Sequence, residues 1–139
     1  MRLHIVARGK IGRGPEKELV DLYLGRIRWP VQVSELGAAD ALPDPATGTK
    51  TIALDERGVP LSSRALADTL RDWRDGGTRE ARFLLGAADG LGEAGRDGAD
   101  VLMSFGAATW PHLLARAMLA EQLFRATSII AGHPYHREG

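Results

Sequence analysis

The end of the chain carries its densest group of reactive side chains. Two imidazoles, a phenol and a guanidinium stand within five positions there, in His133, Tyr135, His136 and Arg137. Imidazole and phenol groups transfer protons, and a guanidinium binds phosphate or stabilises an oxyanion. Chain ends are ordinarily polar and mobile, without a role in a site. This concentration of reactive groups therefore indicates proton transfer and anion binding at the C-terminus.

His133 and His136 are three residues apart and by spacing form half of a metal site. No cluster of carboxylates completes that site, and the chain contains no cysteine. We therefore expect no metal. The absence of cysteine also excludes disulfide bonds, thiol nucleophiles and zinc ribbons, and it fits a reducing compartment.

A glycine-rich segment follows the apolar run 81–85 and begins with Gly86 and Ala87. A glycine directly after a buried strand lets the main chain approach a ligand closely, although a plain turn is the commoner reason for such a segment. The segment matches neither a GxGxxG nor a Walker motif, because no Gly-Lys-Ser/Thr follows. The sequence therefore lacks the motif that would indicate ATP or GTP hydrolysis, and it lacks the one that would indicate ordinary Rossmann dinucleotide binding.

A second loop joins the apolar run 101–105 to the last helical segment. It consists of small residues followed by an aromatic residue and a proline: Gly106, Ala107, Ala108, Thr109, Trp110 and Pro111. Small side chains expose main-chain N–H and C=O groups, which suits an uncharged heterocycle held by hydrogen bonds. An ordinary connection from strand to helix, with Pro111 at the helix start, explains the same residues equally well.

Strands alternate with helices along the chain, and this order positions both loops. Apolar and β-branched runs predict strands at 2–7, 31–36, 51–54, 81–85 and 101–105. Apolar residues three and four apart predict helices over 15–27, 62–75 and 111–130, whereas 38–50 indicates a loop and 56–58 a turn. We expect a parallel, doubly wound α/β sheet in a single domain, residues 1–139. Ligands of such sheets bind beyond the carboxyl ends of the strands, which here follow Leu54, Leu85 and Phe105.

The composition is that of a globular protein. The 139 residues are 44% hydrophobic and 26% charged, and the 6% that are aromatic are too few for a row of stacked bases. Lysine and arginine balance aspartate and glutamate, 18 against 18, whereas a strong electrostatic binder of nucleic acid is basic overall. We recognise neither a signal peptide nor a membrane-spanning run, so we expect a cytoplasmic protein without membrane attachment.

Taken together, these segments resemble the RlmH family of SPOUT-class methyltransferases, which methylate N3 of a pseudouridine in large-subunit ribosomal RNA. The most specific residues are Thr109–His112, which lead into Leu119–Ile130, and the closing segment His133–Glu138. Two features depart from the family. The segment Gly86-Ala87-Ala88-Asp89-Gly90 replaces the usual two glycines, proline, glutamate and glycine, and Trp110 stands where leucine is common. Both departures concern the shape of the cofactor pocket.

The resemblance implies a C-terminal trefoil knot and S-adenosylmethionine as the methyl donor. In this family the cofactor is held by three loops, which correspond here to Leu54, to Gly86-Ala87 and to Gly106–Pro111. The resemblance further implies a homodimer that packs its knot helices together. The implied substrate is 23S ribosomal RNA within the assembled ribosome.

The implied reaction assigns roles to the C-terminal residues. Methylation of an imide nitrogen requires a proton acceptor, together with cationic or N–H groups near the uracil carbonyl oxygens. We expect Arg137 to stabilise a phosphate or a carbonyl oxygen. His133, Tyr135 and His136 stay open as proton acceptor or orienting groups. His112 is a lesser candidate, because a histidine at a helix start is more often structural.

Two other functions stay open. The altered segment 86–90 also fits a ribosome-associated binding module of the same fold that has lost its activity. A phosphate-handling α/β enzyme of flavodoxin-like fold is the second alternative. It requires a phosphate loop at a helix N-terminus, whereas the segment 106–111 ends in proline and lacks a cradle rich in serine and threonine.

Overall fold

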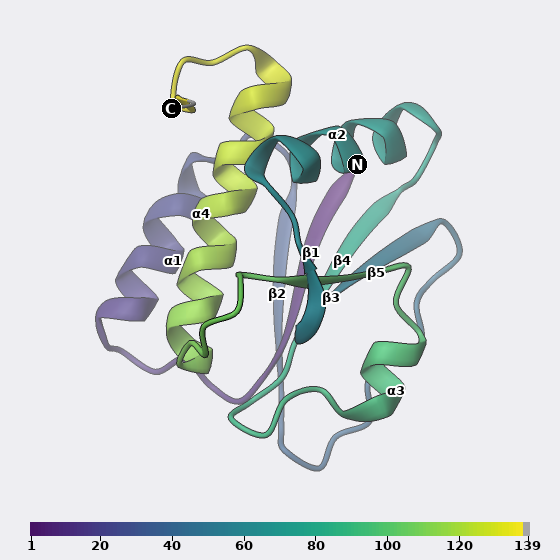
Figure 1. Ribbon diagram of the computed structural model, residues 1–139, viewed down its shortest axis with the longest axis vertical. Helices are drawn as coiled ribbons and strands as arrows, with labels where there is room; N and C mark the ends of the chain where they lie inside the picture. The colour runs from purple at the N-terminus through teal and green to yellow at the C-terminus, as the bar shows by residue number, and fades with distance from the viewer. Residues whose placement is uncertain (138–139) are drawn as a thin grey trace.

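A computed structural model describes residues 1–137 of the chain. Five strands form one sheet in the order β2-β1-β4-β3-β5, and all neighbouring strands are parallel (Figure 1). The strands are β1 (Arg2–Arg8), β2 (Val31–Leu36), β3 (Thr49–Pro60), β4 (Glu80–Leu85) and β5 (Val101–Ser104). The helices are α1 (Pro15–Arg26), α2 (Ser63–Asp75), α3 (Gly92–Asp97) and α4 (His112–Ala131). The predicted parallel α/β sheet is therefore confirmed.

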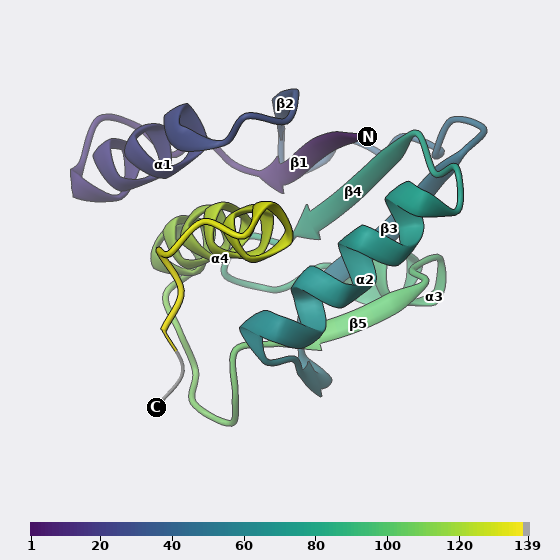
Figure 2. The ribbon, with the colours of Figure 1, turned by 90° about the horizontal axis from the view of Figure 1, so that it is seen from above.

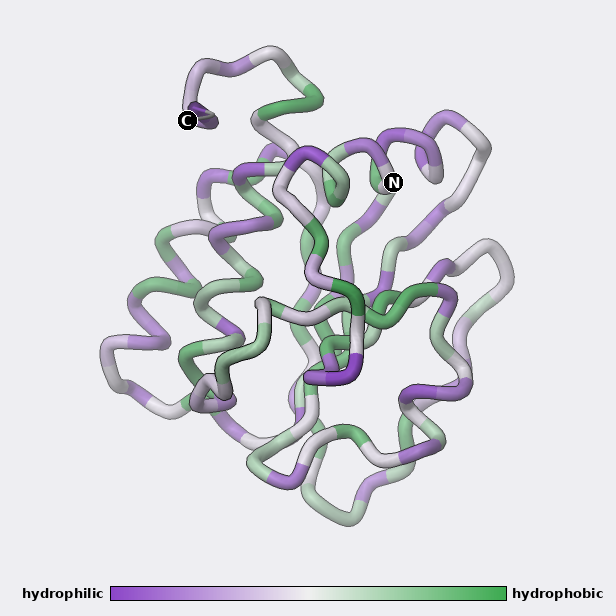
Figure 3. The backbone as a smooth tube through the Cα atoms, in the orientation of Figure 1, coloured by the Kyte–Doolittle hydropathy of each residue, from purple (hydrophilic) through white to green (hydrophobic). Residues whose placement is uncertain are grey.

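The sheet separates two layers of unequal thickness. The helices α1, α2 and α4 cover one face, and the short α3 lies against the other (Figure 2). Successive residues of β1 point to opposite faces, so Leu3 and Ile5 join the large core while Val6 joins a smaller cluster with Leu91, at the start of α3. Hydrophobic residues accordingly gather along the central strands (Figure 3). Every residue of β4 is buried, because this strand has a neighbour on each side and a packed layer on each face.

The longest helix, α4, has 20 residues and packs against both α1 and α2. It begins after Pro111 and ends at Gly132, whose φ of +74° is a left-handed conformation that glycine adopts without strain. Arg116 in its second turn is only 2% exposed. The guanidinium of Arg116 donates hydrogen bonds to Glu35 on β2 and to the Gly9 carbonyl. These contacts fix the start of α4 against the connection between β1 and α1.

The structure corrects the prediction at β3. The residues 56–58 do not end the strand in a turn, because β3 continues to Pro60. The register of β3 against β5 shifts between Leu54 and Val59, so the intervening residues form a bulge. A Cβ at Gly58 would lie 2.6 Å from the main chain of Met103, so the close approach of β5 requires glycine there. Pairing with β5 therefore outweighs the local preference for a turn.

The helix α3 is a second difference from the sequence prediction. It spans six residues, Gly92–Asp97, two of which are glycines. Neither an apolar periodicity nor helix propensity marks so short a segment. Its position is instead fixed by Leu91, which is buried with Val6 and Leu84.

The segment between β5 and α4 crosses from the outer edge of the sheet towards α1 (Figure 1). This crossing is compatible with the trefoil knot that the family resemblance implies, and the knot itself stays a prediction. No helix within residues 1–137 is long and apolar enough to cross a membrane.

Candidate active site

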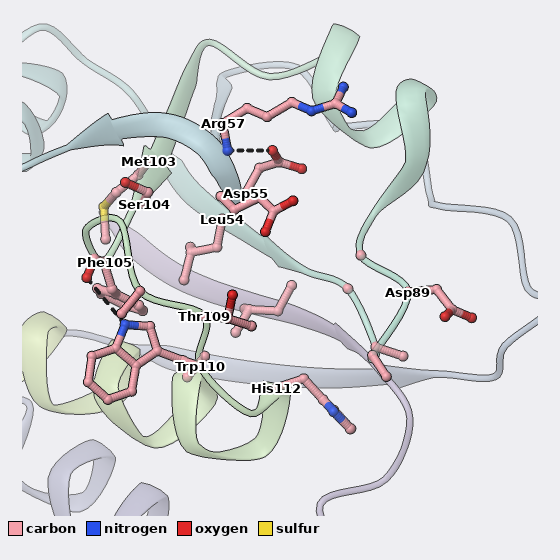
Figure 4. A pocket seen from close by; sticks show the side chains of 18 of the residues that line it. Leu54, Asp55, Arg57, Asp89, Met103, Ser104, Phe105, Thr109, Trp110 and His112 are labelled. Atoms are coloured by element: carbon pink, nitrogen blue, oxygen red, sulfur yellow. Dashed lines mark hydrogen bonds between the residues drawn. The ribbon is translucent and has the colours of Figure 1, made fainter.

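A cavity of about 340 Å³ lies beside the bulge of β3 and the loops that follow β4 and β5 (Figure 4). Because these strands are parallel and adjacent, the segments that leave them converge on one edge of the sheet. The volume falls within the range of small-molecule sites. The three segments after Leu54, Leu85 and Phe105 that the sequence singled out thus surround one cavity, although the first of them is a bulge within β3 and not its end.

Most residues predicted to bind a cofactor line this cavity. They are Leu54, Gly86, Ala87, Gly106, Ala108, Thr109 and Trp110. The other two predicted residues, Ala107 and Pro111, stand in the same loop outside the lining. Side chains of Leu85, Met103 and Phe105 add apolar wall, and His112 at the start of α4 also lines the cavity.

The two glycines that open the loops are required for different reasons. A Cβ at Gly86 would lie 2.2 Å from the main chain of Gly90. Gly90 folds back here and donates a hydrogen bond from its N–H to the Ala87 carbonyl at 2.9 Å, so Gly86 serves the loop's own packing. Gly106 has open space around its Cβ position but a φ of +98°, which only glycine adopts readily.

The loop after β5 presents main-chain donors. The N–H groups of Ala107, Ala108, Thr109 and Trp110 have no hydrogen-bond acceptor within residues 1–137. The Trp110 side chain holds the loop in place, since its indole N–H donates to the Phe105 carbonyl at 3.3 Å (Figure 4). Such a row of unpaired main-chain donors is suited to binding a polar ligand.

Charged side chains at the cavity were missed by the sequence reasoning. They are Asp55, Glu56, Arg57, Asp89 and Arg96. Asp55 accepts a hydrogen bond from the Arg57 N–H at 2.9 Å and forms an ion pair with Arg96 at 3.4 Å. The predicted turn at 56–58 assigned Glu56 and Arg57 to a plain surface connection. The available signal was their position directly after the apolar end of the third strand.

The C-terminal tail, residues 133–137, folds back onto α4. The Tyr135 hydroxyl donates to Glu121 at 3.0 Å, and its ring packs on Phe124 with centroids 4.5 Å apart. Arg125 and the Nδ1 atom of His136 are 3.2 Å apart. The structure therefore brings these tail residues onto one stretch of α4. Glu138, the last residue of the predicted motif, lies outside the described residues.

The tail and the cavity are separated within one chain. None of the described tail residues lines the cavity, although His133 and Arg137 are both exposed. His112 lies at the cavity and Glu121 holds the tail, nine residues further along the same helix. That spacing corresponds to about 13 Å of helix. The two predicted halves of the active site are thus both present but do not meet in a single copy.

Tyr135 is a protonated group at neutral pH. Burial raises the pKa of Tyr135, and the hydrogen bond to the Glu121 carboxylate raises it further, to about 12. The same carboxylate, through its hydrogen bond, raises the pKa of Arg125. Tyr135 is therefore a hydrogen-bond donor here and not a ready proton acceptor.

The described residues contain no cluster of three histidine, cysteine, aspartate or glutamate side chains that could hold a metal ion. The cavity instead combines apolar walls, main-chain N–H groups and charged side chains of both signs. This combination is typical of a site for an organic ligand.

Comparison with known proteins matches this chain to methyltransferases. A family model described as "Predicted SPOUT methyltransferase" matches residues 1–136. Proteins named Ribosomal RNA large subunit methyltransferase H are similar over the full chain. That of Rhizorhabdus wittichii is 64% identical, with 100% of each chain covered, and that of Sphingopyxis alaskensis is 61% identical, with 100% of this chain and 99% of the relative covered.

A solved structure shares the fold. The probable methyltransferase from Bordetella pertussis superposes with a TM-score of 0.61 and 15% sequence identity, over 91% of this chain and 96% of that one. The fold, the cavity at the strand exits and the match along almost the whole sequence agree, and the chain belongs to the SPOUT methyltransferase family.

Proposed function

We propose that this protein methylates N3 of a pseudouridine in 23S ribosomal RNA, with S-adenosylmethionine as the methyl donor. The observation that carries the proposal is the convergence of the β3 bulge and the loops after β4 and β5 on one cavity. This cavity lies in a chain 64% identical to a protein named Ribosomal RNA large subunit methyltransferase H.

The residues of the cavity fit S-adenosylmethionine. Leu54, Leu85 and Met103 offer apolar surface for an adenine ring. The unpaired N–H groups at positions 108–110 offer donors for its nitrogens and polar groups. Glu56 and Asp89 place negative charge at a site that must hold a sulfonium cation. When bound, the cofactor supplies an electrophilic methyl group.

The chemistry at the base requires little beyond positioning and charge. Pseudouridine N3 forms a bond to the methyl carbon while the bond from that carbon to sulfur breaks, and the N3 proton leaves to an acceptor. Negative charge moves from the ring towards the sulfur during this step. Groups that donate hydrogen bonds to the uracil carbonyl oxygens stabilise the ring as its proton leaves.

The tail supplies those groups in this proposal. Arg137 contacts a phosphate or a carbonyl oxygen, and His133, Tyr135 and His136 orient the base. The tail contacts Glu121, which lies about 13 Å along α4 from His112 at the cavity of the same chain. A second copy is therefore needed to bring the tail and a cavity together. We therefore propose a homodimer in which the tail of one copy completes the cavity of the other.

The assembled ribosome is the proposed substrate, and the cytoplasm the proposed location. A protein with a formal net charge of zero is poorly suited to binding free RNA through long-range electrostatic attraction. Recognition of shape on a large particle needs less overall positive charge.

Two measurements test this function. Ribosomes without the modification should be methylated well and the isolated stem-loop poorly, with the product nucleoside identified by mass spectrometry. Equal rates on free RNA and on the particle would contradict the ribosomal substrate. Calorimetric titration with S-adenosylmethionine distinguishes an enzyme from an inactive binding module, because the module would give no heat of binding.

A further inference from the structure

His112 is the first residue of α4 and lines the cavity. Figure 4 shows its side chain where the loop that carries Thr109 and Trp110 joins the helix. A histidine at a helix start is more often structural, but His112 is exposed and provides no helix cap. Within residues 1–137, its imidazole takes part in no hydrogen bond or ion pair. The structure therefore gives this imidazole no structural role.

The position of His112 is nevertheless fixed by its own helix. Arg116, one turn further along α4, is 2% exposed and forms an ion pair with Glu35 on β2. Arg116 also donates a hydrogen bond to the Gly9 carbonyl at 3.1 Å. The start of α4 is thus held against two other segments of the chain. A reactive group on such a rigid support keeps its place in the site when a substrate arrives.

The other three histidines of the chain lie away from the cavity. On β1, the Nε2 atom of His4 is 2.8 Å from the Oγ atom of Ser34. His133 and His136 belong to the tail that docks on α4. None of these three residues lines the cavity. Of the four imidazoles, only that of His112 stands at the cavity of its own chain.

Three carboxylates at the cavity are the competing proton acceptors, namely Asp55, Glu56 and Asp89. Asp55 is already engaged, because it accepts the Arg57 N–H and forms an ion pair with Arg96. An imide nitrogen holds its proton far more tightly than a carboxylic acid does, so a carboxylate is a poor acceptor for the N3 proton. Imidazole is a stronger base than a carboxylate and is better matched to this transfer.

We propose that His112 is the catalytic base that accepts the N3 proton of the target pseudouridine. This inference rests on the proposed function for its substrate, and it names the acceptor which that function requires. The N3–H bond breaks, and its proton passes to the unprotonated ring nitrogen of His112. The electron pair of N3 forms the bond to the methyl carbon, and the pair of the carbon–sulfur bond stays on sulfur. The imidazolium then gives its proton to water.

A histidine that only contacts the RNA backbone is the competing explanation. Such a contact contributes to ribosome binding, and another side chain with a hydrogen-bond donor would replace it. A base must instead accept a proton during the reaction, which the amide of glutamine does not do. The two explanations therefore differ in how the rate responds to glutamine and to an added base.

The test compares His112→Ala and His112→Gln with the wild-type chain on unmethylated ribosomes at saturating S-adenosylmethionine. We expect kcat to fall by roughly 100-fold or more in both variants. Imidazole added to His112→Ala should restore activity in proportion to its concentration, and more basic substituted imidazoles should restore more. His133→Ala, in the tail, is the matched control. Its rate should also fall, but imidazole should not restore it.

Binding provides a second readout that does not depend on turnover. In His112→Gln, the calorimetric affinity for S-adenosylmethionine and the co-sedimentation with ribosomes should stay close to wild type, because glutamine keeps a polar side chain at the cavity. The urea midpoint should also stay unchanged, since the exposed imidazole makes no hydrogen bond within residues 1–137.

The outcomes separate this inference from the proposed function. A wild-type kcat in His112→Gln, or a loss in His112→Ala that imidazole does not restore, would overturn the inference, while methylation by the wild-type chain would still support the proposed function. Weaker ribosome binding with an unchanged kcat would also overturn it, because His112 would then only contact the RNA. Absence of methylation by the wild-type chain would overturn the proposed function and this inference with it.

Discussion

Glu35 on β2 and Arg116 on α4 are joined by an ion pair with an N–O distance of 2.5 Å. The same carboxylate oxygen accepts the main-chain N–H of Ile11, and Arg116 also donates to the Gly9 carbonyl. One ion pair therefore connects β2, the β1–α1 connection and α4. It fixes the end of α4 that carries His112 to the cavity.

Loss of this ion pair should destabilise the protein. Glu35→Gln leaves the buried Arg116 guanidinium without its counter-charge, and we expect the free energy of unfolding to fall by about 3 kcal/mol. Urea denaturation measures the change. Asp21→Asn removes the exposed ion pair of Asp21 with Lys17 and should cost less than about 1 kcal/mol. Equal effects of the two variants would show that the Glu35–Arg116 pair contributes no more than a surface pair.

Acid should destabilise the fold through Glu35 and Glu80. Burial acts to raise the pKa of each carboxyl, but hydrogen bonds from Arg116 to Glu35 and from Arg2 to Glu80 lower it below 4.5 on balance. A lowered pKa stabilises the folded state above the unfolded value, and this contribution is lost as the pH falls through the folded value. The urea midpoint should therefore drop below about pH 4.5. Glu80→Gln should make this dependence shallower, and an unchanged slope would contradict the assignment.

The ionisation of Tyr135 reports on docking of the tail. In the wild-type chain, the phenolate absorbance that Tyr135→Phe removes should appear at a pKa of about 12. Its raised pKa stabilises the folded state below the ordinary value near 10, and this contribution is lost as the pH rises through the folded value. Glu121→Gln should shift the phenol back towards its ordinary pKa. An ordinary value in the wild-type chain would mean that the tail does not dock on α4.

Replacement of Gly106 should impair cofactor binding without unfolding the protein. A valine at a φ of +98° is strained by about 2 kcal/mol, so the loop must change its backbone. We expect S-adenosylmethionine to bind at least 10-fold more weakly in calorimetry. Gly77→Val, at a φ of +93° after α2, introduces the same strain away from the cavity and should leave affinity unchanged. Unaltered affinity in Gly106→Val would mean that the cofactor binds elsewhere.

Deletion of the tail should separate folding from catalysis. A chain without residues 133–139 should fold, dimerise and bind S-adenosylmethionine, because the cavity is lined by residues before the tail. Methyl transfer should fall by at least roughly 100-fold, since the tail supplies the donors around the base. A mixture with Gly106→Val subunits should recover activity through mixed dimers with one intact site. Full activity of the shortened chain alone would refute the role of the tail.

Local patterns in the sequence were sufficient for most of the fold. The strands β1, β2, β4 and β5 and the helices α1, α2 and α4 were predicted because their apolar spacing and their glycine or proline boundaries lie within each segment. The cavity followed from the same reasoning, because parallel strands place the segments after Leu54, Leu85 and Phe105 at one edge. The reactive tail residues were also visible as a group in the sequence.

The sequence by itself thus determined the parallel α/β architecture, the three segments that meet at the cavity and the candidate residues of the tail. Only the tertiary structure decided that β3 continues past its bulge, that α3 exists, and that Asp55 lies at the cavity beside Arg96. It also decided that the tail docks on α4, where the Tyr135 hydroxyl donates to Glu121 and Arg125 lies 3.2 Å from Nδ1 of His136. The physical reason is the range of the interactions. Apolar periodicity and turn chemistry act between neighbours in sequence, whereas strand pairing, ion pairs and hydrogen bonds between distant residues exist only once the chain has folded.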